Sequence, residues 1–231
     1  MSDSRYAIYL APPSDSALHA TASALLGRDA GSGATLPQPK LDGIAPARWL
    51  EITEDARGYG FHGTLKPPFR LATGADPAQL ESAVAEFAAG RAAFEGPPLV
   101  LRAISGFLAL VPERPDPRID RLAADCVREF DRFRAPAGEA ELARRRKAGL
   151  TPRQDEYLLR WGYPYVMEEF RLHFTFTCRL DEAERARVTE ALRPHIERFA
   201  AEPLRIDALV LFQQPAADAP FKILRRFPLG S

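Results

Sequence analysis

Cysteine is nearly absent from this chain, and long apolar runs are missing altogether. Two cysteines, Cys126 and Cys178, are too few for a disulfide framework or a cysteine-rich metal site. No stretch approaches the roughly 18 apolar residues of a membrane span. The N-terminal segment lacks the basic and apolar regions of a signal peptide. The sequence therefore predicts a cytoplasmic protein that has no membrane partner.

Net charge is also missing, because 31 basic residues balance 31 acidic ones. A protein that coats DNA or RNA needs a broad positive surface, so general nucleic-acid binding is not favoured. A local basic pocket for a small anion remains compatible with this balance. The content of 46% hydrophobic and 27% charged residues indicates a folded chain. We expect a monomer that binds a small phosphate ester and uses no cofactor.

The order of the expected elements repeats along the chain. The first half predicts, in order, a strand at 6–10, a helix to about 27, a Gly- and Pro-rich loop at 28–58, a strand at 62–65, a helix from Asp76-Pro77 and a strand at 99–104. The second half predicts, in order, a strand at 107–111, a helix at 116–133, an Arg-rich helical insert at 138–161, a strand at 171–180, a helix opened by Asp181 and strands at 204–212 and 221–227. This order indicates an internal duplication.

The predicted fold is α+β, with residues 1–231 forming a single bilobal domain. Lobe 1 covers approximately residues 14–104 and lobe 2 approximately residues 116–210. Exchange of the terminal strands between the lobes is left open. Each lobe is expected to carry an antiparallel sheet with helices outside, and the two sheets would line a central cleft. The long loop at 28–58 is interpreted as a lid or a substrate-binding segment.

A His-x-Thr triplet stands at the matching point of each half. The two triplets are His62-Gly63-Thr64, within FHGTLKPPF, and His173-Phe174-Thr175, within RLHFTFTCRL. In a strand, side chains at positions i and i+2 point to the same face. The histidine and the threonine of each triplet should therefore share one polar face, while the intervening residues face the core.

The same alternation places basic residues on the polar face. Lys66 should join His62 if its strand continues up to Pro67, and Arg171 should join His173. Both are substrate-binding candidates. Tyr9 on the first strand is a further candidate, with core packing as the alternative.

Two imidazoles that face one another suit acid–base chemistry at a phosphodiester. A neutral histidine removes a proton from the attacking water or hydroxyl, and a protonated one donates to the leaving oxygen. Histidine serves both roles because its ordinary pKa, about 6.5, lies near neutrality. Threonine hydroxyls are suited to donate to phosphate oxygens, and basic side chains would stabilise the charge that develops. The sequence leaves open which histidine is the base and whether water is the nucleophile.

The paired motifs resemble those of the 2H phosphoesterase superfamily. The longer stretches YGFHGTLKPPF, GYPYVMEEFRLHFTFTCRL and FKILRRFPL are similar to a bacterial branch associated with phosphonate metabolism. This resemblance implies a metal-independent, two-lobed phosphodiesterase. His62 and His173 would be the acid–base pair, and Thr64 and Thr175 would bind phosphate.

Other interpretations stay open beside this one. The histidines are alternatively half-buried strand residues or ligands of a zinc ion, although no third ligand stands at a recognisable spacing. Tyr163 and Tyr165 could stack on a base or sugar, or only pack. The basic run ARRRKAG at 143–149 suits RNA contact or a solvated helix face. The alternative functions are RNA binding or RNA-end processing in the same cleft, and non-catalytic sensing of a phosphate ligand.

Overall fold

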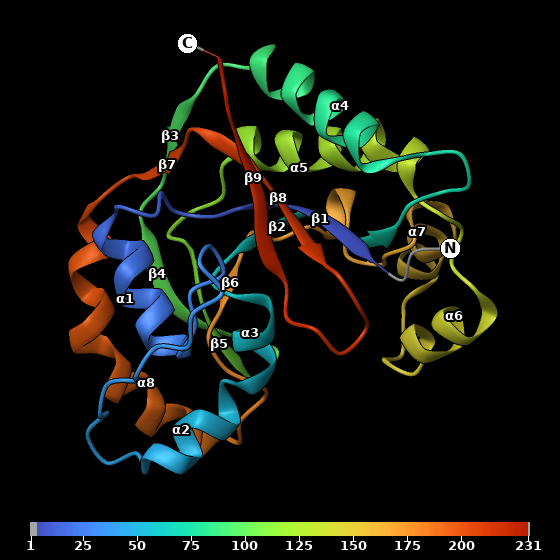
Figure 1. Cartoon of the computed structure of the whole chain (residues 1–231). Coiled ribbons are helices and arrows are strands. Elements are labelled where there is room, and N and C mark those ends of the chain that lie inside the picture. Colours follow the sequence, from blue (N-terminus) through green and yellow to red (C-terminus); the bar gives the residue numbers. More distant parts are fainter. Residues whose placement is uncertain (1–3, 231) are drawn as a thin grey trace.

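The computed structural model describes residues 4–230, which are organised around one antiparallel sheet (Figure 1). Its strands follow the order β4-β5-β6-β2-β1-β8-β9, and a separate small sheet joins β3 to β7. The strands of the described region are β1 (Arg5–Leu10), β2 (Gly63–Arg70), β3 (Phe94–Gly96), β4 (Leu99–Ile104), β5 (Phe107–Pro112), β6 (Phe174–Thr175), β7 (Leu204–Ile206), β8 (Ala208–Gln214) and β9 (Lys222–Pro228).

Several helices begin or end at residues that local capping rules favour. Asp76 forms a reciprocal capping box with Gln79 at the start of α4. Gly27 ends α1 in the left-handed conformation, with φ of 82°. The helices of the described region are α1 (Ala17–Leu26), α2 (Pro46–Ile52), α3 (Glu54–Tyr59), α4 (Pro77–Ala89), α5 (Pro117–Glu129), α6 (Glu139–Arg146), α7 (Pro152–Trp161) and α8 (Glu182–Ile196), with single 3₁₀ turns at Phe130–Phe133, Met167–Glu169 and Glu197–Ala201. No helix within residues 4–230 has the length and apolarity that crossing a bilayer requires.

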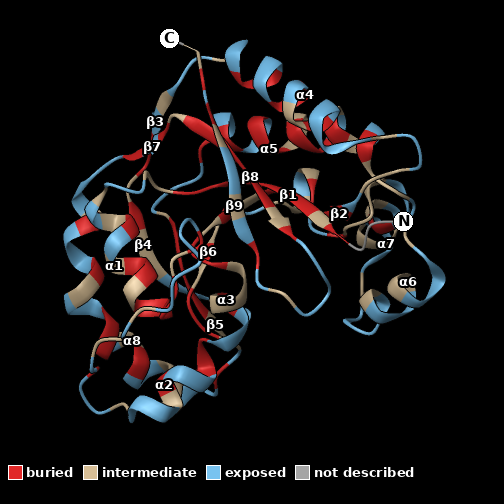
Figure 2. Ribbon diagram, viewed as in Figure 1, coloured by how far each residue is buried: buried red, intermediate tan, exposed pale blue. Residues whose placement is uncertain are grey.

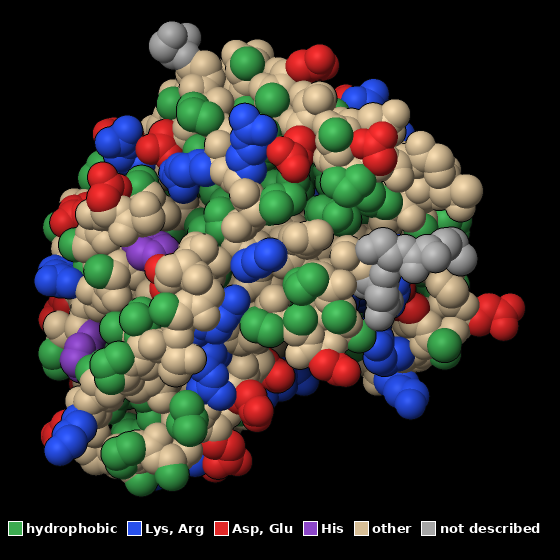
Figure 3. Space-filling view, viewed as in Figure 1, with side chains coloured by type: hydrophobic (Ala, Val, Ile, Leu, Met, Phe, Trp, Pro, Cys, Tyr) green, Lys and Arg blue, Asp and Glu red, His purple; other side chains and the backbone are tan. Residues whose placement is uncertain are grey.

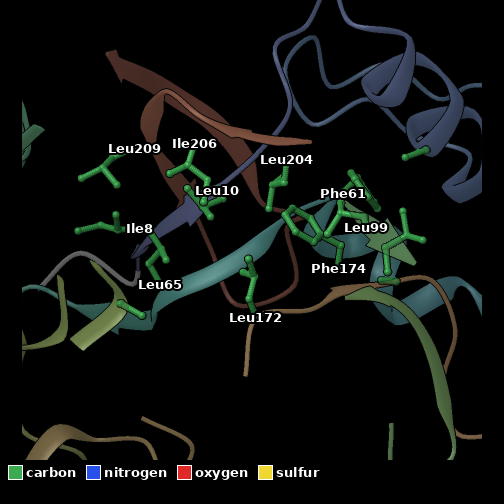
Figure 4. Close-up of a cluster of buried hydrophobic side chains, with 14 of the residues drawn as sticks. Ile8, Leu10, Phe61, Leu65, Leu99, Leu172, Phe174, Leu204, Ile206 and Leu209 are labelled. Carbon is green, nitrogen blue, oxygen red and sulfur yellow. The ribbon is translucent and has the colours of Figure 1, made fainter. Parts of the chain in front are cut away.

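Alternating side chains give the sheet two different faces. On β1, Ile8 and Leu10 join the main hydrophobic core, whereas Ala7 and Tyr9 join a smaller cluster on the opposite face. Helices α1, α4, α5 and α8 all contribute buried apolar side chains to the main core, so they cover one face (Figure 2). Figure 4 shows part of this core, where Ile8 and Leu10 gather with Leu65. These four helices do not cover the opposite face of the sheet.

The two halves of the chain are interleaved in this sheet. β4 from the first half pairs with β5, and β8 from the second half pairs with β1. Helix α5 packs on β2, α4 packs on β8 and β9, and α8 packs on β4 and β5. The α+β class is therefore confirmed. One continuous seven-stranded sheet stands where two sheets were expected.

The segment at 28–58 is loop over most of its length, as its Gly and Pro content predicted, but its last part forms two helices. It contains α2 and α3, whose apolar side chains enter the main core. The buried Trp49 donates through Nε1 to the Leu25 carbonyl at 3.0 Å. Arg48 binds Glu184 of α8 in a bidentate pair at 2.7 and 2.9 Å. Pro46 at the first turn of α2 was the helix signal in this stretch.

Strand β2 continues through Pro67 and Pro68, which were expected to end it. Its pairing with β1 shifts register on both sides of Ile8, so the two prolines fall in an irregular stretch. A proline is tolerated there because a bulged residue does not need to donate to the ladder.

Strand β6 is much shorter than the expected strand at 171–180. After Thr175 the ladder is interrupted, because the Thr177 hydroxyl accepts the hydrogen bond from the Leu108 amide at 3.0 Å. The Cys178 amide then donates to the Ile52 carbonyl of α2 at 2.7 Å. Side-chain and inter-element hydrogen bonds satisfy this backbone in place of a ladder.

Candidate active site

The two His-x-Thr triplets lie side by side on neighbouring antiparallel strands. Gly63 of β2 is directly opposite Phe174 of β6. If this antiparallel register is continued by one residue in each direction, His62 is opposite Thr175 and Thr64 is opposite His173. Opposed residues point to the same side of a sheet, so these four side chains form one group. Each histidine immediately precedes its strand and faces the threonine of the other triplet.

The face on which this group lies follows from its neighbours. Thr64 is opposite Tyr9 of β1, and Thr175 is opposite Ala109 of β5. Tyr9 belongs to the small cluster on the face away from the main core. The intervening Phe174 lies in the main core instead. The triplets therefore present their polar side chains on the face that α1, α4, α5 and α8 leave uncovered.

Both imidazoles are held in the same way. Nδ1 of His62 lies 2.9 Å from the Gly60 carbonyl, and Nδ1 of His173 lies 2.7 Å from the Arg171 carbonyl. A carbonyl only accepts, so each Nδ1 must carry the hydrogen. This assignment leaves Nε2 of each neutral ring as the basic nitrogen. A hydrogen bond that fixes the tautomer is what a proton-transferring histidine needs.

The pKa values of both histidines lie below the ordinary value. Burial is the main cause for His62 and lowers its pKa to about 4; the Gly60 carbonyl opposes this shift and the nearby His173 adds to it. Burial also lowers the pKa of His173, and the Arg171 carbonyl opposes that shift. The electrostatic effect of His173 on His62 agrees with the strand register that places both rings on one face. Both imidazoles are neutral at pH 7 in the ligand-free protein.

Aromatic rings surround His62. Its ring stacks on Tyr9 with a centroid separation of 4.0 Å and lies 5.6 Å from the ring of Tyr59. Tyr59 ends α3, and sequence reasoning missed it although it stands only three residues before His62. On the other side, Phe107 lies 5.6 Å from His173. These contacts explain the desolvation of the imidazoles.

The Tyr9 hydroxyl is a buried polar atom without a hydrogen-bond partner. Thr64 lies close enough to lower the pKa of this phenol, yet no hydrogen bond of ordinary geometry joins the two groups. Burial dominates and raises the pKa of Tyr9 well above its usual value, so the hydroxyl keeps its proton. A protonated donor therefore lies beside Thr64, where the structure leaves it unsatisfied.

Lys66 does not share the face of His62, so this prediction is wrong. It is opposite Ile8 of β1, on the core side, because an extra residue of β2 bulges between Thr64 and Lys66. Its Nζ is buried and donates to the Val127 carbonyl at 3.1 Å and to Asp131 at 3.4 Å. Burial lowers the pKa of Lys66 to about 8, opposed by Asp131.

Arg171 is exposed and precedes β6 by three residues, outside any strand. The sequence prediction relied on strand alternation to place the Arg171 side chain on the face of His173. Because Arg171 lies outside the strand, alternation does not fix the direction of its side chain. What Arg171 supplies to the site is its carbonyl, the acceptor for His173. Its role as a substrate ligand remains a prediction.

The segment around α6 and α7 adds Tyr163 and Arg145 to the surroundings of the histidines. Burial is the main cause that raises the pKa of Tyr163, and Tyr59 adds to that rise. Tyr163 in turn adds to the rise that burial causes in the pKa of Tyr9, so electrostatic interactions link the three phenols. The Arg145 guanidinium lies 4.9 Å from the centroid of the Tyr163 ring. The sequence analysis named the basic run at 143–149, which contains Arg145, but did not distinguish Arg145 from the other basic residues of the run.

The described residues contain no metal-ligand cluster, and two surface cavities lie away from the histidines. Within residues 4–230, no three His, Cys, Asp or Glu side chains are grouped so as to hold a metal ion. A cavity of about 430 Å³ is lined by residues that include Arg91 and Arg118. A second, of about 300 Å³, is lined by residues that include Pro13 and Phe199. Neither lining includes a member of the two triplets.

Comparison with known proteins gives one family and two curated relatives. The family model described as "Protein of unknown function (DUF1045)" matches residues 64–222. Both relatives are named ribose 1,5-bisphosphate phosphokinase PhnN. The protein from Janthinobacterium sp. (strain Marseille) is 40% identical over 231 residues, which is 98% of this chain and 51% of that protein. The protein from Laribacter hongkongensis (strain HLHK9) is 36% identical over 221 residues, 96% of this chain and 51% of that protein. The chain thus spans about half the length of these relatives.

Proposed function

Because the chain belongs to the DUF1045 family, whose description gives no function, we propose one from the site: hydrolysis of a small cyclic phosphodiester by two-histidine acid–base catalysis. The observation that carries this proposal is the opposition of Gly63 and Phe174. It sets two tautomer-fixed imidazoles and two threonine hydroxyls on one face. The resemblance to 2H phosphoesterases, and with it the proposed duplication, agrees with this geometry.

In the proposed reaction, Nε2 of one histidine accepts a proton from water as the water oxygen attacks phosphorus. The ester bond in line with the attack breaks, and the other histidine gives its Nε2 proton to the leaving oxygen. One cyclic diester and one water thus become a monoester and a free hydroxyl. The total charge of the pair is unchanged, and proton exchange with solvent returns each histidine to its starting protonation state. Thr64 and Thr175 donate to the non-bridging oxygens.

The low pKa values of the histidines fit a substrate that brings its own negative charge. A phosphodiester anion beside the rings favours the charged imidazole and raises its pKa. Binding is therefore expected to supply the acid form that the empty site lacks at neutral pH. This coupling ties protonation to the presence of substrate.

The names of the relatives suggest a specific substrate class. Opening a cyclic phosphodiester between C1 and C2 of a ribose 5-phosphate leaves phosphates at C1 and C5. That product is ribose 1,5-bisphosphate, the compound in the name of both relatives. We propose that this half of the longer proteins produces the compound that their other half phosphorylates. Participation in phosphonate metabolism rests on the sequence resemblance.

A second candidate is that this chain itself carries the phosphokinase activity, since the relatives bear that name. The histidine and threonine group favours hydrolysis instead. RNA-end processing is less favoured, because acidic side chains offset part of the charge of the basic run. Arg145 binds Glu141 at 3.2 Å and Arg146 binds Asp155 at 2.6 Å. On the face shown in Figure 3, basic and acidic side chains are interspersed.

The test is a panel of substrates assayed with EDTA present. The panel contains ribose 1,2-cyclic phosphate 5-phosphate, nucleoside 2′,3′-cyclic phosphates and 2′,5′-linked RNA, with ATP plus ribose 1,5-bisphosphate as the kinase arm. We expect turnover of the cyclic esters, reduced about 10²- to 10⁴-fold in His62→Ala and in His173→Ala. His195→Ala in α8 is the matched control. Undiminished turnover in both histidine variants, or activity in the kinase arm alone, would reject the proposal.

A further inference from the structure

Arg145 has an incompletely paired guanidinium close to the candidate active site. Its Nε is buried and has no hydrogen-bond partner. Among the described residues, Glu141 is its one acceptor, bound by Nη2 at 3.2 Å. The side chain is 20% exposed, so part of it is accessible from solvent. Leaving a buried donor without a hydrogen-bond partner is unfavourable. A bound anion would remove that cost.

Arg145 is related to the histidines through three tyrosines. His62 stacks on Tyr9 at 4.0 Å and lies 5.6 Å from Tyr59. The Tyr163 phenol interacts electrostatically with the phenols of both tyrosines. Arg145 lies 4.9 Å from the Tyr163 ring. Arg145 therefore contacts a tyrosine whose phenol interacts with both aromatic neighbours of His62.

Hydrogen bonds join α6, which carries Arg145, to α7, and join α7 to the segment that precedes β6. Arg146 of α6 binds Asp155 of α7 through two hydrogen bonds, at 2.6 and 3.0 Å. Helices α6 and α7 accordingly lie together at one side of the sheet (Figure 1). Gln154 of α7 donates to Glu169, shortly before β6, at 2.8 Å. These bonds hold Arg145 in place before a ligand arrives, which lowers the entropic cost of binding.

We propose that Arg145, supported by the Tyr163 ring, binds a second, non-reacting phosphate of the substrate. A planar guanidinium suits a phosphate because it donates parallel hydrogen bonds to two oxygens. A substrate whose two phosphates stand on opposite sides of a pentose would extend from the histidines, past Tyr9 and Tyr59, toward this guanidinium. This subsite rests on the proposed function and deepens it. It makes the enzyme selective for cyclic esters that carry an additional phosphomonoester.

The experiment compares two substrates that differ only in the second phosphate. These are ribose 1,2-cyclic phosphate with and without a 5-phosphate. In Arg145→Met, which keeps the aliphatic stem over Tyr163, we expect kcat/KM for the 5-phosphorylated ester to fall about 10- to 100-fold, chiefly through KM. The unphosphorylated ester should change less than about threefold, because it never contacts the subsite. Arg145→Lys should recover part of the loss.

The matched control is Arg144→Ala, which removes an exposed arginine from the same helix. It should leave both rates unchanged. An equal loss on both esters in Arg145→Met would overturn the subsite while leaving the hydrolase proposal intact. So would an equal loss in Arg144→Ala and Arg145→Met, which would indicate only general attraction of anions.

A binding measurement separates the subsite from the catalytic proposal. Ribose 5-phosphate and ribose are titrated calorimetrically into wild type and Arg145→Met. We expect ribose 5-phosphate alone to bind, about 10-fold or more weakly to the variant. If neither cyclic ester is hydrolysed but this pattern is found, the subsite stands and the hydrolase proposal fails. Equal affinity of both proteins for ribose 5-phosphate, or no binding to wild type, overturns the subsite.

Discussion

Gly63 and Phe174 are opposed across the β2–β6 pair, and the Phe174 ring fills the space beside the missing side chain of Gly63. A Cβ at position 63 would lie 2.9 Å from Cζ of Phe174 and 2.7 Å from Cδ1 of Leu172. Both distances are shorter than real carbon contacts allow. The small residue of the first triplet and the large residue of the second therefore set how closely the two histidines approach.

Gly63→Ala tests this complementarity. Because Leu172 and Phe174 are packed in the core, they have little room to retreat, and overpacking typically costs about 1–3 kcal/mol. We expect the free energy of unfolding, measured by urea denaturation, to fall by this amount, with loss of turnover. Gly58→Ala is the control, since nothing lies within 4 Å of a Cβ there. A Gly63→Ala protein that is as stable as wild type would contradict the packing argument.

Lys66→Met tests the assignment of Lys66 to the core. Burial lowers the pKa of Lys66 to about 8 in the folded protein, against about 10.4 in an unfolded chain. Keeping the ammonium charged below pH 8 therefore costs stability. A methionine removes this cost, and Asp131 keeps Arg134, which binds it at 2.7 Å. We expect the free energy of unfolding at pH 7 to be about 1–3 kcal/mol higher in the variant than in wild type, with turnover unchanged.

The pH dependence of stability gives a second signature of Lys66. Between pH 8 and about 10.4 the unfolded chain binds the Lys66 proton and the folded protein does not. Wild-type stability should gain from this group as pH rises through that window, and Lys66→Met should lack that gain. A large drop in kcat/KM for the variant would instead favour the original placement of Lys66 at the substrate.

Acid should destabilise the protein through His62. The folded pKa of about 4 lies below the unfolded value of about 6.5, so the unfolded chain alone takes up the proton between them. The contribution of His62 to the free energy of unfolding is complete above pH 6.5 and is lost as the pH falls to 4. The loss is at most about 3 kcal/mol. Denaturation of wild type and His62→Gln at pH 7 and pH 4.5 should show a smaller pH effect in the variant.

The catalytic pH profile should be acid-shifted. The proposed reaction needs one neutral and one protonated imidazole, and both histidines have pKa values below the ordinary value in the free protein. The singly protonated pair therefore becomes more abundant as pH falls below 7, and disappears once both rings are charged. We expect kcat/KM, which reports the free enzyme, to peak below pH 6.5. A peak above pH 8 would be incompatible with this pair.

Tyr9→Phe should separate stability from activity. The hydroxyl is buried without a hydrogen-bond partner, so its removal breaks no bond and is expected to leave stability unchanged or higher. The same change removes a donor beside Thr64, and kcat/KM should fall about tenfold or more. Tyr6→Phe on the same strand is the opposite control. It loses the bond from Gln213 at 3.2 Å, which should lower stability and spare activity.

Local signals in the sequence predicted much of the fold. Asp76 with Pro77 marked the start of α4, and Gly27 marked the end of α1, because capping depends on residues within one turn. The two triplets were found from their two-residue spacing and matched order. Tyr59 and Arg145 belong to no comparable motif, and the sequence does not show that Tyr59 lies beside the His62 ring or Arg145 beside the Tyr163 ring.

The sequence by itself determined the composition of the site: two histidines, two threonines and the strands that carry them. Only the tertiary structure decided how they meet, through the register that sets Gly63 against Phe174. It also decided that Lys66 faces the core, because an extra residue bulges in β2. Alternation is a local rule that sequence reveals. Register and bulges depend on which strand pairs with which, and that is settled by packing between distant segments.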